Sequence, residues 1–210
     1  MNRVIDLVKD NKITVIGITG GVGCGKSTIV DYIKEQYNAT VFKADDIGHI
    51  VMQRGNLAYD KIVQYFGEDI LDMNLQIDRK ALSNLVFNNT EKLEYLNSII
   101  HPAVEQYIAD NIILEYENSK KLFVIEAALL IEAGYKRVCN ELWYIYASKE
   151  ERIKRLMSSR GYSRNKCIDI MDNQLSDAEF KANCNVLIDN GNDFKYSKIQ
   201  IEKHMNFCYN

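Results

Sequence analysis

The stretch "GITGGVGCGKST", residues 17–28, decides the fold of this chain. It follows the apolar run "ITVIGI" at residues 13–18 and precedes a segment with helical spacing. Four of its residues match the P-loop pattern G-x-x-x-x-G-K-[ST], namely Gly20, Gly25, Lys26 and Ser27. That pattern is informative only between a strand and a helix, and here the flanking sequence supplies both. The stretch therefore predicts a strand, a phosphate-binding loop and a helix in succession.

The residue types explain what such a loop can bind. Glycine has no Cβ, so phosphate oxygens can approach the backbone amides and the positive end of the following helix. Lys26 would place its charge between the β- and γ-phosphates of a nucleoside triphosphate, and the Ser27 hydroxyl would be a ligand of Mg²⁺. We interpret Cys24 as a small residue that fills a tight turn rather than as a redox-sensitive thiol. The residues expected to contact the nucleotide in this loop are Gly20, Gly21, Val22, Gly23, Cys24, Gly25, Lys26, Ser27 and Thr28.

Apolar runs rich in β-branched and aromatic residues alternate with helical patterns, which predicts an α/β fold with a parallel sheet buried on both faces. The five predicted strands cover residues 13–18, 39–42, 122–127, 142–146 and 185–188. Two capping boxes, Ser148 with Glu151 and Ser176 with Glu179, predict helix starts. The interval 46–118 is too long for one crossover and carries several helical patterns, so we interpret it as a helical insertion. Pro102, the single proline, is expected in the first turn of a helix.

Composition limits the class of protein. The chain has 210 residues, 47% hydrophobic and 26% charged, as expected for a globular protein of one domain. The formal net charge of −3 argues against nucleic-acid binding. The five cysteines include no C-x-x-C pair, so neither a disulfide framework nor a zinc site is predicted. The sequence has no apolar run of membrane-spanning length and no secretory signal, so we expect a cytoplasmic protein that binds no membrane.

A GTPase is one alternative, because "DDIG" at 45–48 formally supplies D-x-x-G. "NKCID" at 165–169 nearly supplies N-K-x-D, but Ile168 stands where the aspartate is needed. That segment also has a helical pattern and does not follow a strand. We interpret both matches as coincidence.

A small-molecule kinase needs a metal ligand, a base and cations besides the phosphate loop. Glu126 ends the third predicted strand, where either a second magnesium ligand or a solvent-facing carboxylate is expected. Asp45 follows the second strand, at the edge where open parallel sheets bind ligands, and could accept a proton from an acceptor hydroxyl. The candidate cations cluster on and after the helix that begins near residue 149, namely Arg152, Arg155 and Arg160.

Several stretches together give the chain a resemblance to the dephospho-coenzyme A kinase family over nearly its whole length. The most specific is "DRKALSNLVF" followed by "LNSIIHP"; others are "ADDIGHIV", "YFGEDIL", "ALLIEAGY", "RIKRLM" and "VLIDNGN". The resemblance implies a P-loop NTPase fold with three α/β/α layers, a five-stranded parallel sheet and one domain over 1–210. Its core would be 13–45 and 119–210, the acceptor-binding insertion about 46–118, and the lid about 150–175. It further implies ATP-dependent phosphorylation of the ribose 3′-hydroxyl of dephospho-CoA, the last step of coenzyme A biosynthesis.

The resemblance also assigns roles. Asp45 would be the general base, Arg79 and His101 would contact the acceptor, Arg155 would be a lid arginine, and Asn190 would shape the adenine pocket. From the residues alone, Asn190 fits a turn that closes the last strand, and His101 fits a helix entry equally well. Four positions depart from the family pattern, namely Lys43, His49, Ala128 and Ser159.

Two other functions stay open at this point. One is a kinase for a different small acceptor, such as a nucleoside monophosphate, and the other is a nucleotide-binding regulator without acceptor chemistry. The expected partners are the small molecules ATP and dephospho-CoA, and a monomer is favoured.

Overall fold

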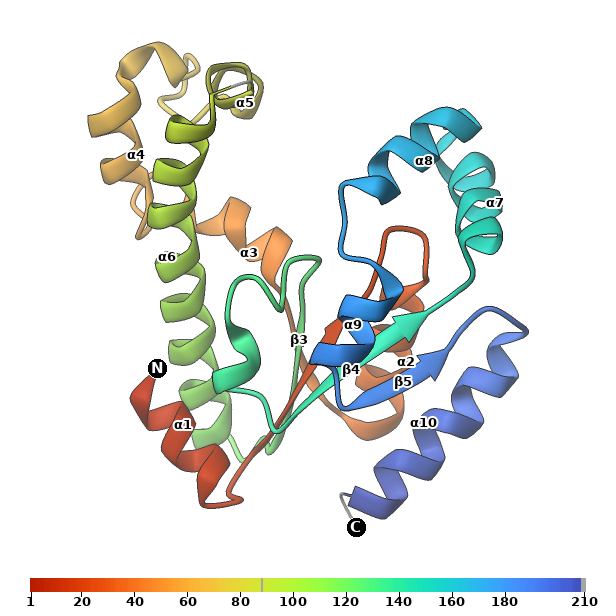
Figure 1. Ribbon diagram of the computed structural model, residues 1–210. Coiled ribbons are helices and arrows are strands. Elements are labelled where there is room, and N and C mark those ends of the chain that lie inside the picture. The colour runs from red at the N-terminus through yellow and green to blue at the C-terminus, as the bar shows by residue number, and fades with distance from the viewer. Residues whose placement is uncertain (88, 209–210) are drawn as a thin grey trace. The chain divides into compact units, whose positions relative to one another are not determined.

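The computed structural model describes residues 1–87 and 89–208 (Figure 1). The chain forms two compact units. A helical unit comprises residues 1–4 and 42–118, and a sheet unit comprises residues 5–41 and those from Ser119 onward.

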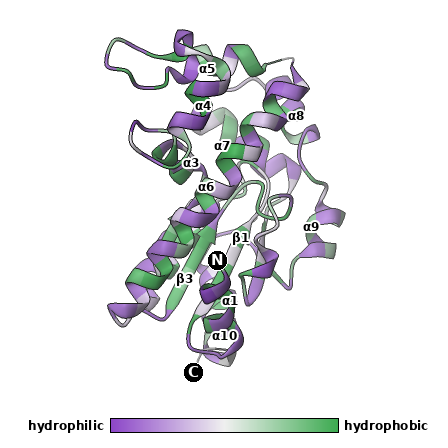
Figure 2. Cartoon of the chain, turned by 90° about the vertical axis from the view of Figure 1, so that its left-hand side faces the viewer, coloured by the Kyte–Doolittle hydropathy of each residue, from purple (hydrophilic) through white to green (hydrophobic). Residues whose placement is uncertain are grey.

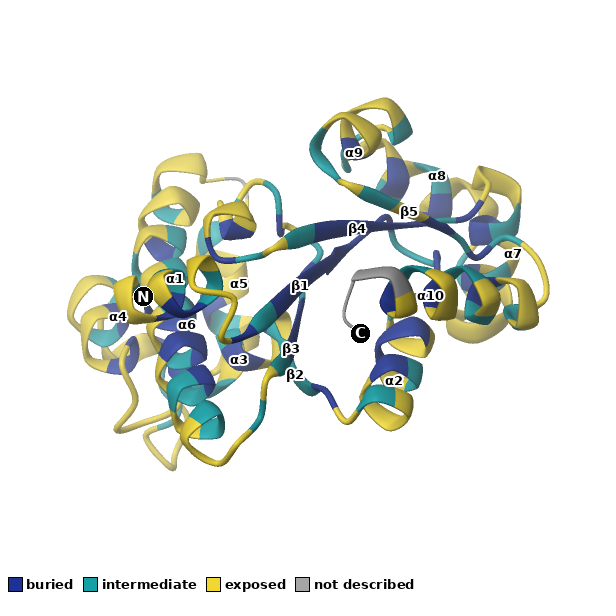
Figure 3. Ribbon diagram, turned by 90° about the horizontal axis from the view of Figure 1, so that it is seen from below, coloured by how far each residue is buried: buried dark blue, intermediate teal, exposed yellow. Residues whose placement is uncertain are grey.

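A five-stranded parallel sheet confirms the predicted α/β class. The strands run in the order β2-β3-β1-β4-β5, and the pairs β1–β3, β1–β4 and β4–β5 are parallel. Their bounds are Thr14–Thr19 for β1, Thr40–Lys43 for β2, Leu122–Glu126 for β3, Glu141–Tyr146 for β4 and Val186–Asp189 for β5. Each predicted run is a strand, because β-branched and aromatic side chains suit a sheet covered on both faces. The central strands are almost wholly buried (Figure 3).

Helices cover both faces of this sheet, as predicted for three layers. In Figure 3, α2 (Lys26–Tyr37) and α10 (Phe194–Cys208) lie on one face and α9 (Asp177–Asn183) lies on the other. Trp143 is fully buried in the core that includes residues of α2 and α10. Its neighbour Tyr144 stacks on Phe180 of α9, with ring centroids 4.8 Å apart. Adjacent strand residues thus contact opposite layers, as the alternation of side chains along a strand requires.

Two further helices of the sheet unit, α7 (Lys149–Arg160) and α8 (Arg164–Asp172), pack against each other. The Ser148 side chain accepts a hydrogen bond from the Glu151 amide, and Gly161 ends α7 in the left-handed conformation. The second predicted capping box is complete, because Ser176 and Glu179 each bond the backbone of the other. A short helix, η2 (Tyr135–Arg137), lies between β3 and β4.

The helical unit is built around α6 (Thr90–Glu117), which packs against α3, α4 and α5. Figure 2 shows hydrophobic and hydrophilic residues interspersed along α6. Its buried residues Leu96, Val104, Ile108 and Ile112 recur at spacings of eight and four, which places them on one side of the helix. The remaining helices of this part are α3 (Ala44–Val51), α4 (Tyr59–Phe66), η1 (Glu68–Ile70) and α5 (Arg79–Val86), and α1 (Asn2–Lys9) begins in it.

The prediction that Pro102 begins a helix is wrong. Pro102 lies inside α6, which continues through it without interruption. A proline within a helix costs about 3 kcal/mol, because it lacks the N–H that would bond the carbonyl four residues earlier. Burial of apolar residues on both sides of it offsets this cost, including Leu96 before it and Val104 and Ile108 after it. Hence His101 is also an interior helix residue rather than a helix-entry residue.

No helix among the described residues is long and apolar enough to cross a membrane. The cysteines at 24, 139, 167 and 184 are all free thiols.

Candidate nucleotide-binding site

The P-loop joins β1 to α2 at the carboxyl ends of the parallel strands. Gly23 (φ 79°) and Gly25 (φ 89°) have left-handed backbone conformations, which favour glycine. Gly25 is the N-cap of α2 and offers no side-chain hydrogen bond to its first turn. The first amides of α2 are therefore not capped by that residue, and they carry the positive end of the helix dipole. This combination binds anions.

The two chemically active side chains of the motif follow this cap. The Lys26 Nζ donates a hydrogen bond of 2.8 Å to the carbonyl oxygen of Gly20, so the lysine folds back over the loop. Ser27 and Thr28 are exposed on the first turn of α2. The Lys26 ammonium and the Ser27 hydroxyl therefore both lie in the region that a bound triphosphate would contact.

A second group of side chains bonds the loop from outside, at the carbonyl oxygen of Cys24. Asn190, directly after β5, donates to it at 2.8 Å, and Arg155 of α7 donates at 3.2 Å. Arg155 also donates to the Asn190 carbonyl at 2.7 Å and to Glu151 at 3.0 Å. Both residues expected to contact ATP therefore lie at the loop, but their side chains bond its backbone in this structure. Asn190 is only 4% exposed.

The other two arginines of the predicted cation cluster, Arg152 and Arg160, lie in environments that differ from each other. Arg152 is buried against the loop, where its Nε donates to the Val22 carbonyl at 2.8 Å. Arg160 is exposed, with its guanidinium 5.9 Å from the ring centroid of Tyr162. Helical spacing could not distinguish these environments, because the loop packs on only one side of α7.

The Cys24 side chain fills the interior of the loop. It is 1% exposed, and burial raises the pKa of its thiol, although Lys26 and Arg152 act in the opposite direction. A thiol that is buried and neutral is a poor nucleophile. These properties agree with a residue that fills a tight turn.

The pair of residues proposed for magnesium lies on two neighbouring elements. Glu126 ends β3, where its Cα pairs with that of Ile18 at the end of β1. Its charge also contributes to raising the pKa of Cys24 in the loop, so the carboxylate is near that loop. The described residues contain no cluster of three or more His, Cys, Asp or Glu side chains suited to a metal. Mg²⁺ commonly binds one or two protein oxygen ligands together with phosphate oxygens and water, and the hydroxyl of Ser27 with the carboxylate of Glu126 fits that chemistry.

Three predicted acceptor residues belong to the helical unit. Asp45 is exposed in the first turn of α3, which starts directly after β2. Arg79 is the exposed first residue of α5, and His101 is partly buried in α6. Helices α3 and α6 pack closely, because a Cβ on Gly48 would lie 3.9 Å from a methyl group of Ile100. The structure thus brings the helices that carry Asp45 and His101 into contact.

Both formal GTPase matches lie in helices. "DDIG" is part of α3, and "NKCID" is part of α8. Neither can act as a loop that senses or reads guanine nucleotide, which supports our interpretation of coincidence.

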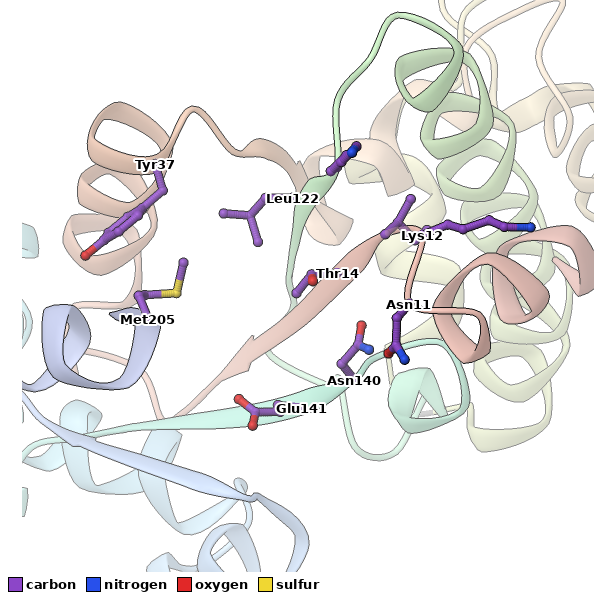
Figure 4. A pocket seen from close by; sticks show the side chains of 10 residues that line it. Asn11, Lys12, Thr14, Tyr37, Leu122, Asn140, Glu141 and Met205 are labelled. Atoms are coloured by element: carbon purple, nitrogen blue, oxygen red, sulfur yellow. The ribbon is translucent and has the colours of Figure 1, made fainter. Parts of the chain in front are cut away.

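A separate cavity of about 710 Å³ lies at the other end of the strands, where the strands begin (Figure 4). Thr14, Leu122 and Glu141, which begin β1, β3 and β4, line it together with Tyr37 and Met205. Open parallel sheets bind ligands at the carboxyl ends of their strands. Because this cavity lies at the amino ends of the strands, we do not assign it as the nucleotide site, in spite of its size.

Sequence reasoning assigned no role to two residues that hold this region together, Gln174 and Ser197. Gln174 accepts a hydrogen bond from the Val22 amide, and Ser197 donates to the Asn190 side chain. Neither residue belongs to a motif with a chemical role. Only the folded chain shows which carbonyl or amide each one meets.

The parallel sheet, the P-loop at the carboxyl ends of its strands and the open first turn of α2 define the class of P-loop nucleotide-binding proteins. Comparison with known proteins narrows this class. The sequence model of the dephospho-CoA kinase family matches residues 14–195. The chain belongs to the dephospho-CoA kinase family.

Individual relatives agree with this assignment. The dephospho-CoA kinase of Dehalococcoides mccartyi is 39% identical over 182 residues, covering 86% of this chain and 90% of the relative. That of Carboxydothermus hydrogenoformans is 36% identical over 187 residues, covering 89% and 90%. The solved structure of dephospho-CoA kinase from Campylobacter jejuni superposes with a TM-score of 0.67 at 27% identity, covering 91% of this chain and 95% of that one.

Proposed function

We propose that this protein transfers the γ-phosphoryl group of ATP to the ribose 3′-hydroxyl of dephospho-CoA, giving CoA and ADP. Family membership supports the acceptor. The observation that carries the proposal is the intact P-loop, with Lys26 folded over it and the first turn of α2 uncapped by Gly25. We further propose that the protein acts in the cytoplasm as a monomer.

In this proposal the sheet unit binds the nucleotide. The loop amides and the start of α2 bind the β- and γ-phosphates, and Lys26 exchanges the Gly20 carbonyl for phosphate oxygens. Ser27 and Glu126 would hold a Mg²⁺ ion, which supplies positive charge to the transferred phosphoryl group. Asn190 shapes the adenine pocket, and Arg155 stabilises the charge that develops during transfer.

The helical insertion, about 46–118, binds dephospho-CoA with Arg79 and His101 among its contacts. Asp45 accepts the proton of the 3′-hydroxyl as that oxygen forms a bond to Pγ. The bond between Pγ and the β,γ-bridging oxygen breaks at the same time, and ADP leaves. A lid at about 150–175 closes over the site and excludes water.

The first test is an ADP-release assay with ATP and a panel of acceptors. We expect release that depends on dephospho-CoA and not on nucleoside monophosphates. Phosphorylation of a monophosphate instead would favour the second kinase hypothesis. Release that is independent of any acceptor would contradict both.

The second test replaces single side chains. Asp45→Asn should lower kcat by about 10²–10⁴ with little change in ATP binding, because it removes the base alone. Asp46→Asn, the neighbouring carboxylate in the same turn, is the matched control and should stay near the parent. Normal turnover by Asp45→Asn would show that the base is another group. Lys26→Ala should weaken the use of ATP itself.

A further inference from the structure

Both backbone groups of one P-loop residue are bonded by side chains from outside the loop. The Val22 amide donates to Gln174 Oε1 at 2.9 Å, and the Val22 carbonyl accepts from Arg152 Nε at 2.8 Å. Arg152 closes the ring, because its Nη2 donates to the same Gln174 oxygen at 3.1 Å. We name these three residues the Val22 clasp.

The loop is also packed tightly against α7 at this point. A Cβ on Gly23 would lie 3.0 Å from the Arg152 carbonyl oxygen and 3.1 Å from Leu156, and a Cβ on Gly21 would overlap the Arg152 guanidinium. The Val22 side chain packs on a cluster of α7 and α8 that includes Ile153 and Met171. The chain path on either side of Val22 is therefore fixed by contacts as well as by hydrogen bonds.

The charge in the clasp is unusual for its environment. Arg152 is only 8% exposed, and no ion pair among the described residues includes it. A buried cation without a carboxylate partner is costly unless it is well hydrogen-bonded or faces an anion. Its field reaches the loop, since Arg152 acts to lower the pKa of Cys24. Asp172 and Asp177 line the same cavity as Arg152 but form no ion pair with it, and a bound triphosphate would add further negative charge.

The geometry points to Arg152, together with Gln174, as a positioning residue for ATP. It acts through the Val22 peptide, whose own N–H is already bonded to Gln174 and so is directed away from a ligand. The amides that follow Val22 are thereby held in place before ATP arrives, which lowers the ordering cost of binding. This inference rests on the proposed phosphotransfer for its kinetic test, but not for its binding test.

The binding test is a titration of the parent protein and its variants with ADP, without any acceptor. Arg152→Ala and Gln174→Ala should each raise the dissociation constant of ADP about tenfold, the factor that matches one charge-assisted hydrogen bond. Arg152→Lys should not restore binding, because an ammonium cannot reproduce the two-point geometry of the guanidinium. The double variant should bind ADP no more weakly than the worse single variant, because each single substitution already breaks the same ring of hydrogen bonds.

Arg3→Ala is the matched control. Arg3 belongs to α1, outside the P-loop and the proposed lid, and its exposed side chain pairs with Glu117 at 3.1 Å. We expect its ADP affinity to stay within about twofold of the parent.

Kinetics separate positioning from general loss of structure. We expect the clasp variants to raise the KM for ATP while the KM for dephospho-CoA stays within about twofold. An ADP affinity equal to that of the parent in folded clasp variants would overturn the inference. It would also be overturned if the KM for ATP and the KM for dephospho-CoA rose equally, in proportion to the fall in melting temperature. If Arg152→Ala does not fold, Gln174→Ala decides the question. If no acceptor is phosphorylated, the proposed function fails while the ADP titration still tests the clasp.

Discussion

Replacing Asn190 with alanine should both destabilise the sheet unit and weaken nucleotide binding. The Asn190 amide group is almost fully buried, donates to the Cys24 carbonyl at 2.8 Å and accepts from Ser197 Oγ at 2.8 Å. It also lies against Gly25, where any Cβ would overlap its nitrogen. Asn190 thus joins the end of β5, the P-loop and α10.

The size of the effect follows from what each partner retains. Two hydrogen bonds are lost, at about 1 kcal/mol each. The Cys24 carbonyl keeps its bond from Arg155, and Ser197 keeps its bond to the Asp189 carbonyl, so neither polar group is left alone. The small void left by the amide adds a further part. We expect a total loss of about 2–3 kcal/mol, or roughly 5–10 °C in melting temperature for a chain of this length.

The assay is thermal unfolding followed by circular dichroism, with an ADP titration of the folded protein. Asn192→Ala is the matched control, because Asn192 is exposed two residues further along. Asn190→Asp should bind ADP even more weakly than Asn190→Ala, since it would direct a carboxylate at the Cys24 carbonyl and the phosphate site. A melting temperature of Asn190→Ala within about 1 °C of the parent would refute the reasoning.

Three other outcomes are expected. Asp78→Ala should lower the free energy of unfolding by about 1 kcal/mol in urea denaturation, because the Asp78 side chain caps α5 by accepting from the amides of Lys80 and Ala81; an unchanged midpoint would contradict this. Cys24 should react with iodoacetamide at least about 10²-fold more slowly in the folded protein than in denaturant, as judged by mass spectrometry, since its thiol is buried and its pKa is raised. Burial raises the pKa of the Cys139 thiol from 9.0 to about 12, so between these pH values the folded state keeps a proton that the unfolded state loses. The thiol's contribution to the free energy of unfolding is therefore full below about pH 9 and is lost as the pH rises to about 12. Between roughly pH 8 and pH 10.5 the parent should therefore lose more stability than Cys139→Ala, and equal losses would count against the effect.

The sequence predicts the framework of this protein well because the framework depends on local patterns. The apolar run before the glycines forms β1, and Ser176 with Glu179 begins α9 as the capping box requires. The P-loop depends on glycines whose backbone conformation few other residues adopt. Such features depend on a few neighbouring residues in the sequence.

The environment of single side chains depends on distant contacts, and there sequence reasoning is weaker. Arg152 and Arg160 look equivalent on a helical pattern, yet one is buried at the loop and the other is exposed. Pro102 looks like a helix start until the packing on both sides of it is known. The roles of Asp45, Arg79 and His101 are proposals drawn from the resemblance, because spacing along the chain does not show which side chains an acceptor contacts.

The order of the strands has a consequence for how the chain folds during synthesis. The central strand β1 pairs with β3 and β4, which follow it by about a hundred residues or more, so its neighbours leave the ribosome long after it does. Closing so long a loop is entropically costly and slows folding. Residues 42–118, in contrast, make most of their contacts within one continuous stretch. We therefore expect the helical unit to become structured on the ribosome first, while the apolar β1 waits unpaired and is the segment most in need of protection by a chaperone.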